Sequence, residues 1–136
     1  VGMVLVDVDY FKRYNDRYGH LQGDACLQPV AAGIQSCVHR ETDLVARYGG
    51  EEFAIILPDT DAQGTSAVAE RMVQAVRALE IAHSCSEVAK VVTISAGTAS
   101  HVPCAGGAQQ LIRCADEALY GAKAAGRNQA ARHVCP

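Results

Sequence analysis

The chain has 136 residues, of which 49% are hydrophobic and 20% charged, and its formal net charge is −3. This length indicates one domain that is long enough to bury a core, and the hydrophobic content argues against a disordered chain. The small negative charge excludes a general nucleic-acid or membrane surface, although a local basic pocket is compatible with it. No apolar run approaches the ~20 residues that span a bilayer, and no stretch resembles a signal peptide. We expect a cytoplasmic domain; a membrane anchor elsewhere in a longer parent protein is compatible with this.

The cysteines show no pattern of a metal site or a disulfide framework. They are Cys26, Cys37, Cys85, Cys104, Cys114 and Cys135. None forms a Cys-x-x-Cys pair, which argues against zinc, and Cys26, Cys37 and Cys114 fall within helical patterns. We expect small buried or half-buried thiols in a reducing cytosol.

The first part of the chain predicts a strand followed by two helices. Residues 1–9 alternate with a period of two, which is typical of a strand, here buried on both faces until its aspartate end. Residues 10–17 suit a short helix with Asp9 as its N-cap. A longer helix is predicted from about Asp24. Because Pro29 lies past its first turn, we expect a kink or a slightly later start.

The rest of the chain predicts an α+β arrangement. After a hairpin over residues 43–57, the pattern indicates a helix capped within residues 59–61 and a polar connection over residues 82–90. A strand over residues 91–100 and a loop over residues 103–107 follow. The chain then continues with a helix ended by Gly126 and a short strand over residues 129–134. Strands and helices do not alternate strictly, which excludes a doubly wound parallel sheet. We predict an α+β sandwich with helices mainly on one face of the sheet.

The hairpin, residues 43–57, contains two adjacent glutamates, Glu51 and Glu52, directly after Gly49-Gly50. The glycine pair supplies the positive φ angles of a tight turn and lets a ligand approach the backbone. Like charges at the start of a buried strand do not favour stability, so they indicate either a solvated hairpin tip or a cation site. Asp7 also ends a strand next to a turn, and Mg²⁺ prefers one or two carboxylates plus substrate phosphates. The sequence leaves both interpretations open.

Two further pairs of residues have ambiguous patterns. Asn15 and Asp24 offer an amide and a carboxylate that suit the edge of a guanine base, but both residue types also cap helices. Lys123 and Arg127 lie four residues apart at the end of the last predicted helix. This position suits either a clamp on a triphosphate or a favourable interaction with the helix C-terminus.

Three blocks of the sequence together resemble a known family. They are RYGGEEF at residues 47–53, the segment from Asp7 to Asp24, and ADEALYGAKAAGRN at residues 115–128. They resemble the GGDEF domains, the diguanylate cyclases, in the GGEEF version of the signature, and the resemblance covers essentially the whole chain. It implies a palm-like α+β fold, with a mainly antiparallel central sheet flanked by helices as in adenylyl cyclase and polymerase palms.

The resemblance also implies a set of metal-binding and catalytic residues. Asp7, the backbone carbonyl of Val8 and Glu51 match the family's ligands of two Mg²⁺ or Mn²⁺ ions. Glu51 also matches the acceptor of the proton from the 3′-hydroxyl. Lys12 matches the lysine that stabilises charge on the phosphates, with backbone amides near Phe11 helping.

The substrate-binding residues are implied in the same way. For GTP they are Phe11, Asn15, His20, Asp24, Gly49, Gly50, Lys123 and Arg127. Within this set Asn15 and Asp24 match the pair that reads guanine, and Lys123 and Arg127 match the pair that holds phosphates. Glu52 belongs to the signature, but we assign it only a supporting role. We interpret Asp9 as a helix cap rather than a metal ligand.

Residues 40–43, Arg-Glu-Thr-Asp, are separated from Gly49 by five residues. They resemble the family's RxxD inhibitory site, in which the arginine and the aspartate bind the product cyclic di-GMP. In our interpretation Arg40 and Asp43 form this site, and Arg71 on the next helix extends it.

The function implied by the resemblance is the condensation of two GTP into cyclic di-GMP and two pyrophosphates, by two-metal phosphoryl transfer between two copies of the domain. One alternative is a catalytically inactive sensor module that binds cyclic di-GMP; another is a cyclase of mixed nucleotide choice, against which Asp24 argues. The family's N-terminal helix and D-x-L-T-G-L-x-N-R stretch are absent from residues 1–136. We therefore expect a domain cut from a protein that carries an attached sensory or receiver domain.

Overall fold

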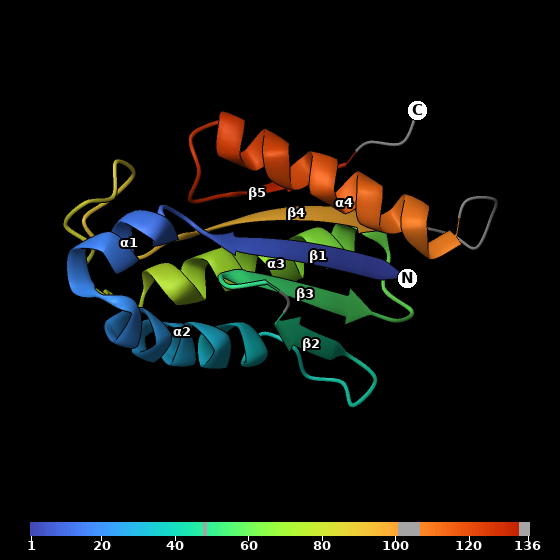
Figure 1. Cartoon of the computed structure of the whole chain (residues 1–136). Coiled ribbons are helices and arrows are strands. Elements are labelled where there is room, and N and C mark those ends of the chain that lie inside the picture. The colour runs from blue at the N-terminus through green and yellow to red at the C-terminus, as the bar shows by residue number, and fades with distance from the viewer. Residues whose placement is uncertain (48, 101–106, 134–136) are drawn as a thin grey trace.

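The chain folds around one mixed β-sheet with helices on both of its faces (Figure 1). The structure is a computed structural model and describes residues 1–47, 49–100 and 107–133. The elements are β1 (Gly2–Val8), α1 (Phe11–Tyr18), α2 (His20–Gln35), β2 (Leu44–Arg47), β3 (Glu52–Leu57), α3 (Ala62–Arg77), β4 (Ile94–Ser100), α4 (Gly107–Ala124) and β5 (Ala130–Arg132). Within the described residues the sheet order is β2-β3-β1-β4-β5; β5 runs parallel to β4, and the other neighbours pair antiparallel. The predicted α+β class is confirmed.

The central strand, β1, is buried on both faces, as its alternation predicts. Val4, Val6 and Val8 pack in the core formed with α1, α2 and α3. Met3 and Leu5 point the opposite way and pack against α4. Figure 1 shows α4 crossing one face of the sheet while α2 and α3 lie on the other. Most of the helices, α1, α2 and α3, therefore pack on one face of the sheet, and α4 covers the opposite face.

The prediction that Asp9 caps the first helix is wrong. The residue before α1 is Tyr10, in the left-handed conformation with φ 54°, and no side chain caps the helix. The Asp9 carboxylate instead accepts hydrogen bonds from the hydroxyls of Thr93 (2.7 Å) and Ser95 (2.6 Å) and from the backbone N–H of Asn128 (3.0 Å). These donors come from the start of β4 and from the connection to β5, so Asp9 is satisfied by long-range contacts.

The second helix begins at His20, earlier than the predicted Asp24. Gly19 has φ 92°, a conformation that glycine adopts easily, and it connects α1 directly to α2. Pro29 lies inside the helix, so the expected later start is wrong. Pro29 and Ala25, whose carbonyl would otherwise accept a hydrogen bond from position 29, are both exposed. Water can replace the missing bond there, which reduces the cost of the proline.

The predicted hairpin and the cap of the third helix are confirmed. β2 and β3 pair around the glycines, and Gly49 has φ 73°. The Asp61 carboxylate accepts from the N–H of Gly64 at 2.7 Å and so caps α3. Two details differ from the prediction. The spacing of Leu79 after Val76 predicts that it lies on the inner face of this helix, but it lies beyond α3 and is 39% exposed; His83 in the polar connection is completely buried.

The described cysteines are free thiols, and the expectation that they are buried or half-buried is wrong for Cys85. Cys26 and Cys114 are buried within helices, Cys37 is buried just past the end of α2, and Cys85 is exposed. Cys104, Cys135 and most of the predicted loop at residues 103–107 lie outside the described residues. Among the helices described, none is long and apolar enough to cross a membrane.

Gly97 in β4 sets how closely α4 approaches the sheet. A Cβ atom at this position would lie 2.1 Å from the backbone nitrogen of Leu119 and 2.3 Å from the carbonyl oxygen of Ala115. Both are helix backbone atoms and cannot move aside alone. We predict that Gly97→Ala lowers the free energy of unfolding by at least ~2 kcal/mol, measured by urea denaturation.

The matched control for this change is Gly121→Ala on the exposed side of α4, where no atom lies within 4 Å of an added Cβ. It should raise the free energy of unfolding by up to about 1 kcal/mol, because alanine favours the helix. Equal effects of the two substitutions would show that close approach at Gly97 does not matter.

Candidate active site

The two carboxylates predicted to form a cation site lie at the same end of neighbouring strands. β1 and β3 pair in a register that places Asp7 opposite Glu52, and the Val8 N–H donates to the carbonyl of Glu51 at 3.2 Å. Asp7 and Glu51 thereby line one pocket of about 180 Å³. Its complete lining is Asp7, Val8, Asp9, Tyr10, Phe11, Lys12, Glu51, Lys123 and Arg127. The pocket brings together residues from both ends of the sequence.

Lys123 supplies a counter-charge within this pocket. It lies in the last turn of α4, and its Nζ is 2.5 Å from Oδ2 of Asp7. Both side chains are substantially buried, with 34% of the Lys123 side chain and 11% of the Asp7 side chain exposed. The sequence patterns predicted either a phosphate clamp or a helix-end interaction for Lys123. In this structure the partner of Lys123 is the carboxylate of Asp7.

The pocket disfavours a second negative charge. Burial raises the pKa of the Glu51 carboxyl, and the neighbouring charges of Asp7 and Glu52 raise it further, whereas Lys123 acts in the opposite direction. Among the described residues no group of three or more histidine, cysteine, aspartate or glutamate side chains could hold a metal. Two carboxylates without a third ligand suit Mg²⁺ or Mn²⁺, hard ions that take their remaining ligands from water and substrate phosphates.

One wall of the pocket is the turn from β1 into α1. Tyr10, Phe11 and Lys12 form this wall, and Lys12 is exposed at its rim. The first backbone N–H groups of a helix have no partner within the helix, and they favour an anion. The first turn of α1 and the Lys12 ammonium therefore give this wall a positive character.

Arg127 is placed beside the pocket by contacts with Tyr10. It lies after the end of α4 in the left-handed conformation, with φ 64°. Its Nη1 donates to the Tyr10 hydroxyl at 3.3 Å, and its guanidinium lies 4.5 Å from the centre of the Tyr10 ring. The Arg13 guanidinium also lies over this ring, at 4.6 Å. Such cation–π contacts hold the Arg127 side chain at the pocket.

The predicted guanine-reading residues lie on α1 and α2 and do not line the pocket described above. Oδ1 of Asn15 is buried and has no hydrogen-bond partner in the described part of the chain. Asp24 and His20 are exposed at the start of α2. Gly23 matters here although the sequence reading missed it, because a Cβ there would lie 1.8 Å from Asn15 Oδ1. A glycine directly before Asp24, at the start of the predicted helix, was the feature that could have indicated it.

Arg47 supports the turn that carries the glutamates, a role that the sequence reading also missed. Its Nε and Nη2 donate to the carbonyl of Gly50 at 3.1 and 2.8 Å. A Cβ at Gly49 would lie 2.7 Å from Oε2 of Glu52, so the glycine leaves room for that side chain. The hairpin tip is thus fixed by its own motif residues.

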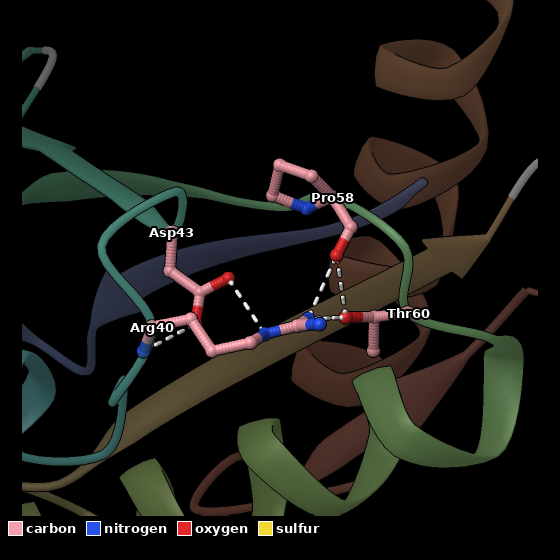
Figure 2. Close-up of polar contacts among 4 residues, drawn as sticks. All are labelled: Arg40, Asp43, Pro58 and Thr60. Atoms are coloured by element: carbon pink, nitrogen blue, oxygen red, sulfur yellow. Dashed lines mark hydrogen bonds and ion pairs between the residues drawn. The ribbon is translucent and has the colours of Figure 1, made fainter.

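The predicted inhibitory pair is formed and lies in the segment before β2 (Figure 2). Arg40 Nε lies 3.6 Å from Asp43 Oδ1, and the Arg40 N–H donates to Asp43 Oδ2 at 3.3 Å. Arg40 Nη2 also donates to the Pro58 carbonyl at 2.7 Å and to the Thr60 hydroxyl. Arg40 therefore ties this segment to the loop after β3. Arg71 is exposed on α3 and makes no hydrogen bond or ion pair with Arg40 or Asp43 within the residues described.

Comparisons with known proteins agree with the fold and the family predicted from the sequence. Residues 1–129 match the family described as diguanylate cyclase, GGDEF domain. The chain belongs to this family. It is 41% identical over 129 residues to diguanylate cyclase A of Treponema denticola, and 39% identical over 128 residues to the response regulator PleD of Caulobacter vibrioides. These matches cover 95% and 94% of the chain but only 34% and 28% of the relatives, so the chain spans about a third of their length.

Solved structures support the palm-like α+β fold. The active GGEEF domain of a diguanylate cyclase from Vibrio cholerae superposes with a TM-score of 0.83 at 30% identity, covering 99% of this chain and 83% of that one. The GGDEF domain of DgcB from Caulobacter crescentus, in complex with c-di-GMP, gives a TM-score of 0.86 at 32% identity, covering 97% and 77%. The fold and the family predicted from the sequence are confirmed.

The raised pKa of Glu51 leads to a prediction about stability. Its folded pKa lies above the ordinary value of 4.5, so the folded state holds this proton more tightly than the unfolded state does. Stability therefore falls as pH rises through this window, and the charged Glu51 is unfavourable at neutral pH. We predict that Glu51→Gln, without divalent cations, is more stable than the wild type at pH 7. This gain should shrink as pH falls below 4.5.

Urea denaturation in the presence of a chelator measures this difference at both pH values. Glu70→Gln, on the exposed side of α3, controls for the loss of a negative charge elsewhere. A Glu51→Gln protein that is less stable than the wild type at pH 7 would contradict the electrostatic interpretation.

Proposed function

We propose that this domain is a diguanylate cyclase, which condenses two GTP into cyclic di-GMP and two pyrophosphates. The observation that carries the proposal is the pocket shared by Asp7 and Glu51, in which Lys12, Lys123 and Arg127 supply positive charge. Carboxylates that suit a divalent cation and cations that suit phosphates are the groups that phosphoryl transfer requires. The family relationship supports the same activity.

The donor set fits two Mg²⁺ or Mn²⁺ ions. Asp7, Glu51 and the backbone carbonyl of Val8 would hold them, because oxygen ligands suit these hard cations. The raised pKa of Glu51 supports this assignment, since a nearby cation would offset the cost of burying its negative charge. When bound, the ions supply neutralisation of phosphate charge and a lower pKa for the attacking hydroxyl.

The protein side chains position the substrate and move the proton. Glu51 accepts the proton of the 3′-hydroxyl as that oxygen attacks the α-phosphorus of the second GTP. Lys12 and the backbone amides near Phe11 stabilise the charge on the phosphates, and Lys123 and Arg127 hold them. Lys123, which pairs with Asp7 in this structure, gains a phosphate partner when the nucleotide binds.

Recognition of guanine is assigned to α1 and α2. Asp24 accepts from the N1–H and amino groups of the base, a pair of donors that adenine does not present. Asn15 contributes its side-chain amide, and Gly23 leaves room for that side chain. His20 lies beside them at the start of α2, and Gly49 and Gly50 let the substrate approach the hairpin.

Catalysis then requires two copies of the domain. Each copy binds one GTP, and the two bound nucleotides must face each other for two bonds to form. In the parent protein we assign the control of this encounter to an attached sensory or receiver domain.

Arg40 and Asp43 are proposed to bind cyclic di-GMP as an inhibitor, with Arg71 extending the site. Two observations support this: Arg40 and Asp43 form an ion pair, and a solved relative is in complex with c-di-GMP. The contacts of Arg40 with Pro58 and Thr60 hold its guanidinium in place, which lowers the cost of ordering it on binding (Figure 2). The same site is the basis of the alternative function, a sensor module that binds cyclic di-GMP and makes none.

The first test of the activity is Glu51→Gln, incubated with GTP and Mg²⁺ while the products are identified by mass. We predict a loss of cyclic di-GMP formation of about a thousandfold or more, because the variant loses both a metal ligand and the proton acceptor. Glu52→Gln is the matched control in the same motif and should keep most of the activity. Substantial cyclisation by Glu51→Gln would contradict the assignment. A wild type that binds cyclic di-GMP and forms none would favour the sensor.

Product inhibition is tested by Arg40→Ala. Removing a charged hydrogen-bond donor should raise the concentration of cyclic di-GMP that halves the initial rate by about tenfold or more. Thr60→Val is the comparison variant, because it removes one contact of Arg40 but keeps the guanidinium. An Arg40→Ala enzyme inhibited as strongly as the wild type would exclude this site.

A further inference from the structure

The segment between α3 and β4, residues 81–92, forms a support beside helix α1; in Figure 1 it is the yellow loop next to that helix. Its two arms are held together by backbone contacts. The His83 N–H donates to the Lys90 carbonyl at 2.9 Å, and the Val92 N–H donates to the Ile81 carbonyl at 2.7 Å. The segment is therefore an ordered part of the fold although its composition is polar.

His83 reaches from this segment to the turn before α1. Its side chain is completely buried, and Nε2 lies 3.0 Å from the carbonyl oxygen of Tyr10. A carbonyl only accepts hydrogen bonds, so Nε2 carries the hydrogen and donates it. The imidazole also packs edge-on against the ring of Tyr14, with the ring centres 5.2 Å apart.

The ring is held in its neutral form. Nδ1 is buried without a hydrogen-bond partner in the described ranges. A proton added there would be a buried charge without an acceptor, and burial accordingly lowers the pKa of His83. The neutral ring therefore carries its single hydrogen on Nε2, where it donates to the Tyr10 carbonyl.

The Tyr10 carbonyl links His83 to the first turn of α1, which borders the pocket. It accepts both from His83 and from the N–H of Tyr14, at 3.1 Å, which is the first hydrogen bond of α1. Tyr10 adopts the left-handed conformation, which is uncommon for a residue other than glycine, and no side chain caps the helix. The His83 hydrogen bond therefore acts on the carbonyl that begins the helix, and the residues that follow, Phe11 and Lys12, form a wall of the pocket.

The far end of α1 is held by the same segment. The Tyr18 hydroxyl accepts from the N–H of Ser84 at 3.1 Å and donates to the Ser84 hydroxyl at 3.2 Å. Contacts at Tyr10 and at Tyr18 fix both ends of the helix, so its direction depends on residues 81–92. Glu87 adds an ion pair with Arg13 at 3.1 Å, in which both side chains are largely exposed.

We propose that His83 is a positioning residue for the phosphate-binding wall of the pocket. By donating to the Tyr10 carbonyl it fixes the turn that aims Lys12 and the first N–H groups of α1 at the substrate phosphates. His83 itself touches no substrate. The inference rests on the proposed function, because it takes a nucleotide phosphate as the ligand of this wall.

Two substitutions separate the hydrogen bond from packing. His83→Phe keeps an aromatic ring against Tyr14 but cannot donate, whereas His83→Gln can place an amide N–H near the position of Nε2. With the whole chain, GTP and Mg²⁺, His83→Phe should raise KM for GTP about tenfold, the effect of one lost hydrogen bond, with a smaller change in kcat. His83→Gln should restore KM to within about threefold of the wild type.

Glu87→Gln is the control within the same segment, since it removes only an exposed ion pair and should leave KM unchanged. Ile34→Val, a buried change in α2, controls for general destabilisation. An unchanged KM in His83→Phe would overturn the proposal. An increase in KM of the same size in Ile34→Val would also overturn it, because it would show a general effect of stability.

A second readout does not depend on activity. Amide hydrogen exchange without nucleotide should become about tenfold faster at the N–H of Tyr14 in His83→Phe, because its acceptor is no longer held. Exchange along β4 should stay unchanged. If the wild type makes no cyclic di-GMP, the proposed function fails, and exchange at Tyr14 alone decides the role of His83. The positioning role would be overturned if exchange became faster uniformly along the chain. It would also be overturned if the exchange rate at Tyr14 did not change.

Discussion

The ion pair between Asp7 and Lys123 joins the end of the first strand to the last helix, and the pocket is arranged around it. Glu51 approaches from the neighbouring strand, and its pKa is raised by burial and by the charge of Asp7. Two carboxylates thus share one ammonium group at the base of a small pocket. Such an arrangement reduces the stability of the isolated fold and favours a divalent cation there. The site that we propose for metal and phosphate is therefore a site of unfavourable charge in the protein alone.

Buried polar contacts of Asp9, which lines the pocket, hold the walls of the pocket in place. The Asp9 carboxylate accepts from Thr93, from Ser95 and from the N–H of Asn128, which directly follows Arg127. Burial raises the pKa of Asp9, while these three hydrogen bonds act in the opposite direction. The start of β4 and the turn that carries Arg127 are thereby tied to the end of β1. Hydrogen bonds of Asp9 thus help to place Arg127 at the pocket, as a preorganised site requires.

The parts of the fold predicted from sequence are those determined by local pattern. The alternation of residues 1–9 predicted β1 and its two buried faces, and Gly49-Gly50 predicted the hairpin, because period and turn chemistry are properties of neighbouring residues. The family's motifs brought Asp7 and Glu51 together as candidates. The partners of Asp9 could not be predicted, since they lie 84 to 119 residues away. His83 looked like part of a polar loop because its acceptor, the Tyr10 carbonyl, is 73 residues away and carries no side-chain signature.

The proposal depends on two domains meeting with one GTP each. The most direct test is the initial rate of cyclic di-GMP formation, measured per domain at saturating GTP and Mg²⁺ over a wide range of protein concentration. If two copies must combine, the rate per domain rises in proportion to concentration while most of the protein is monomeric. A rate per domain that stays constant while the protein remains monomeric would contradict catalysis between two copies.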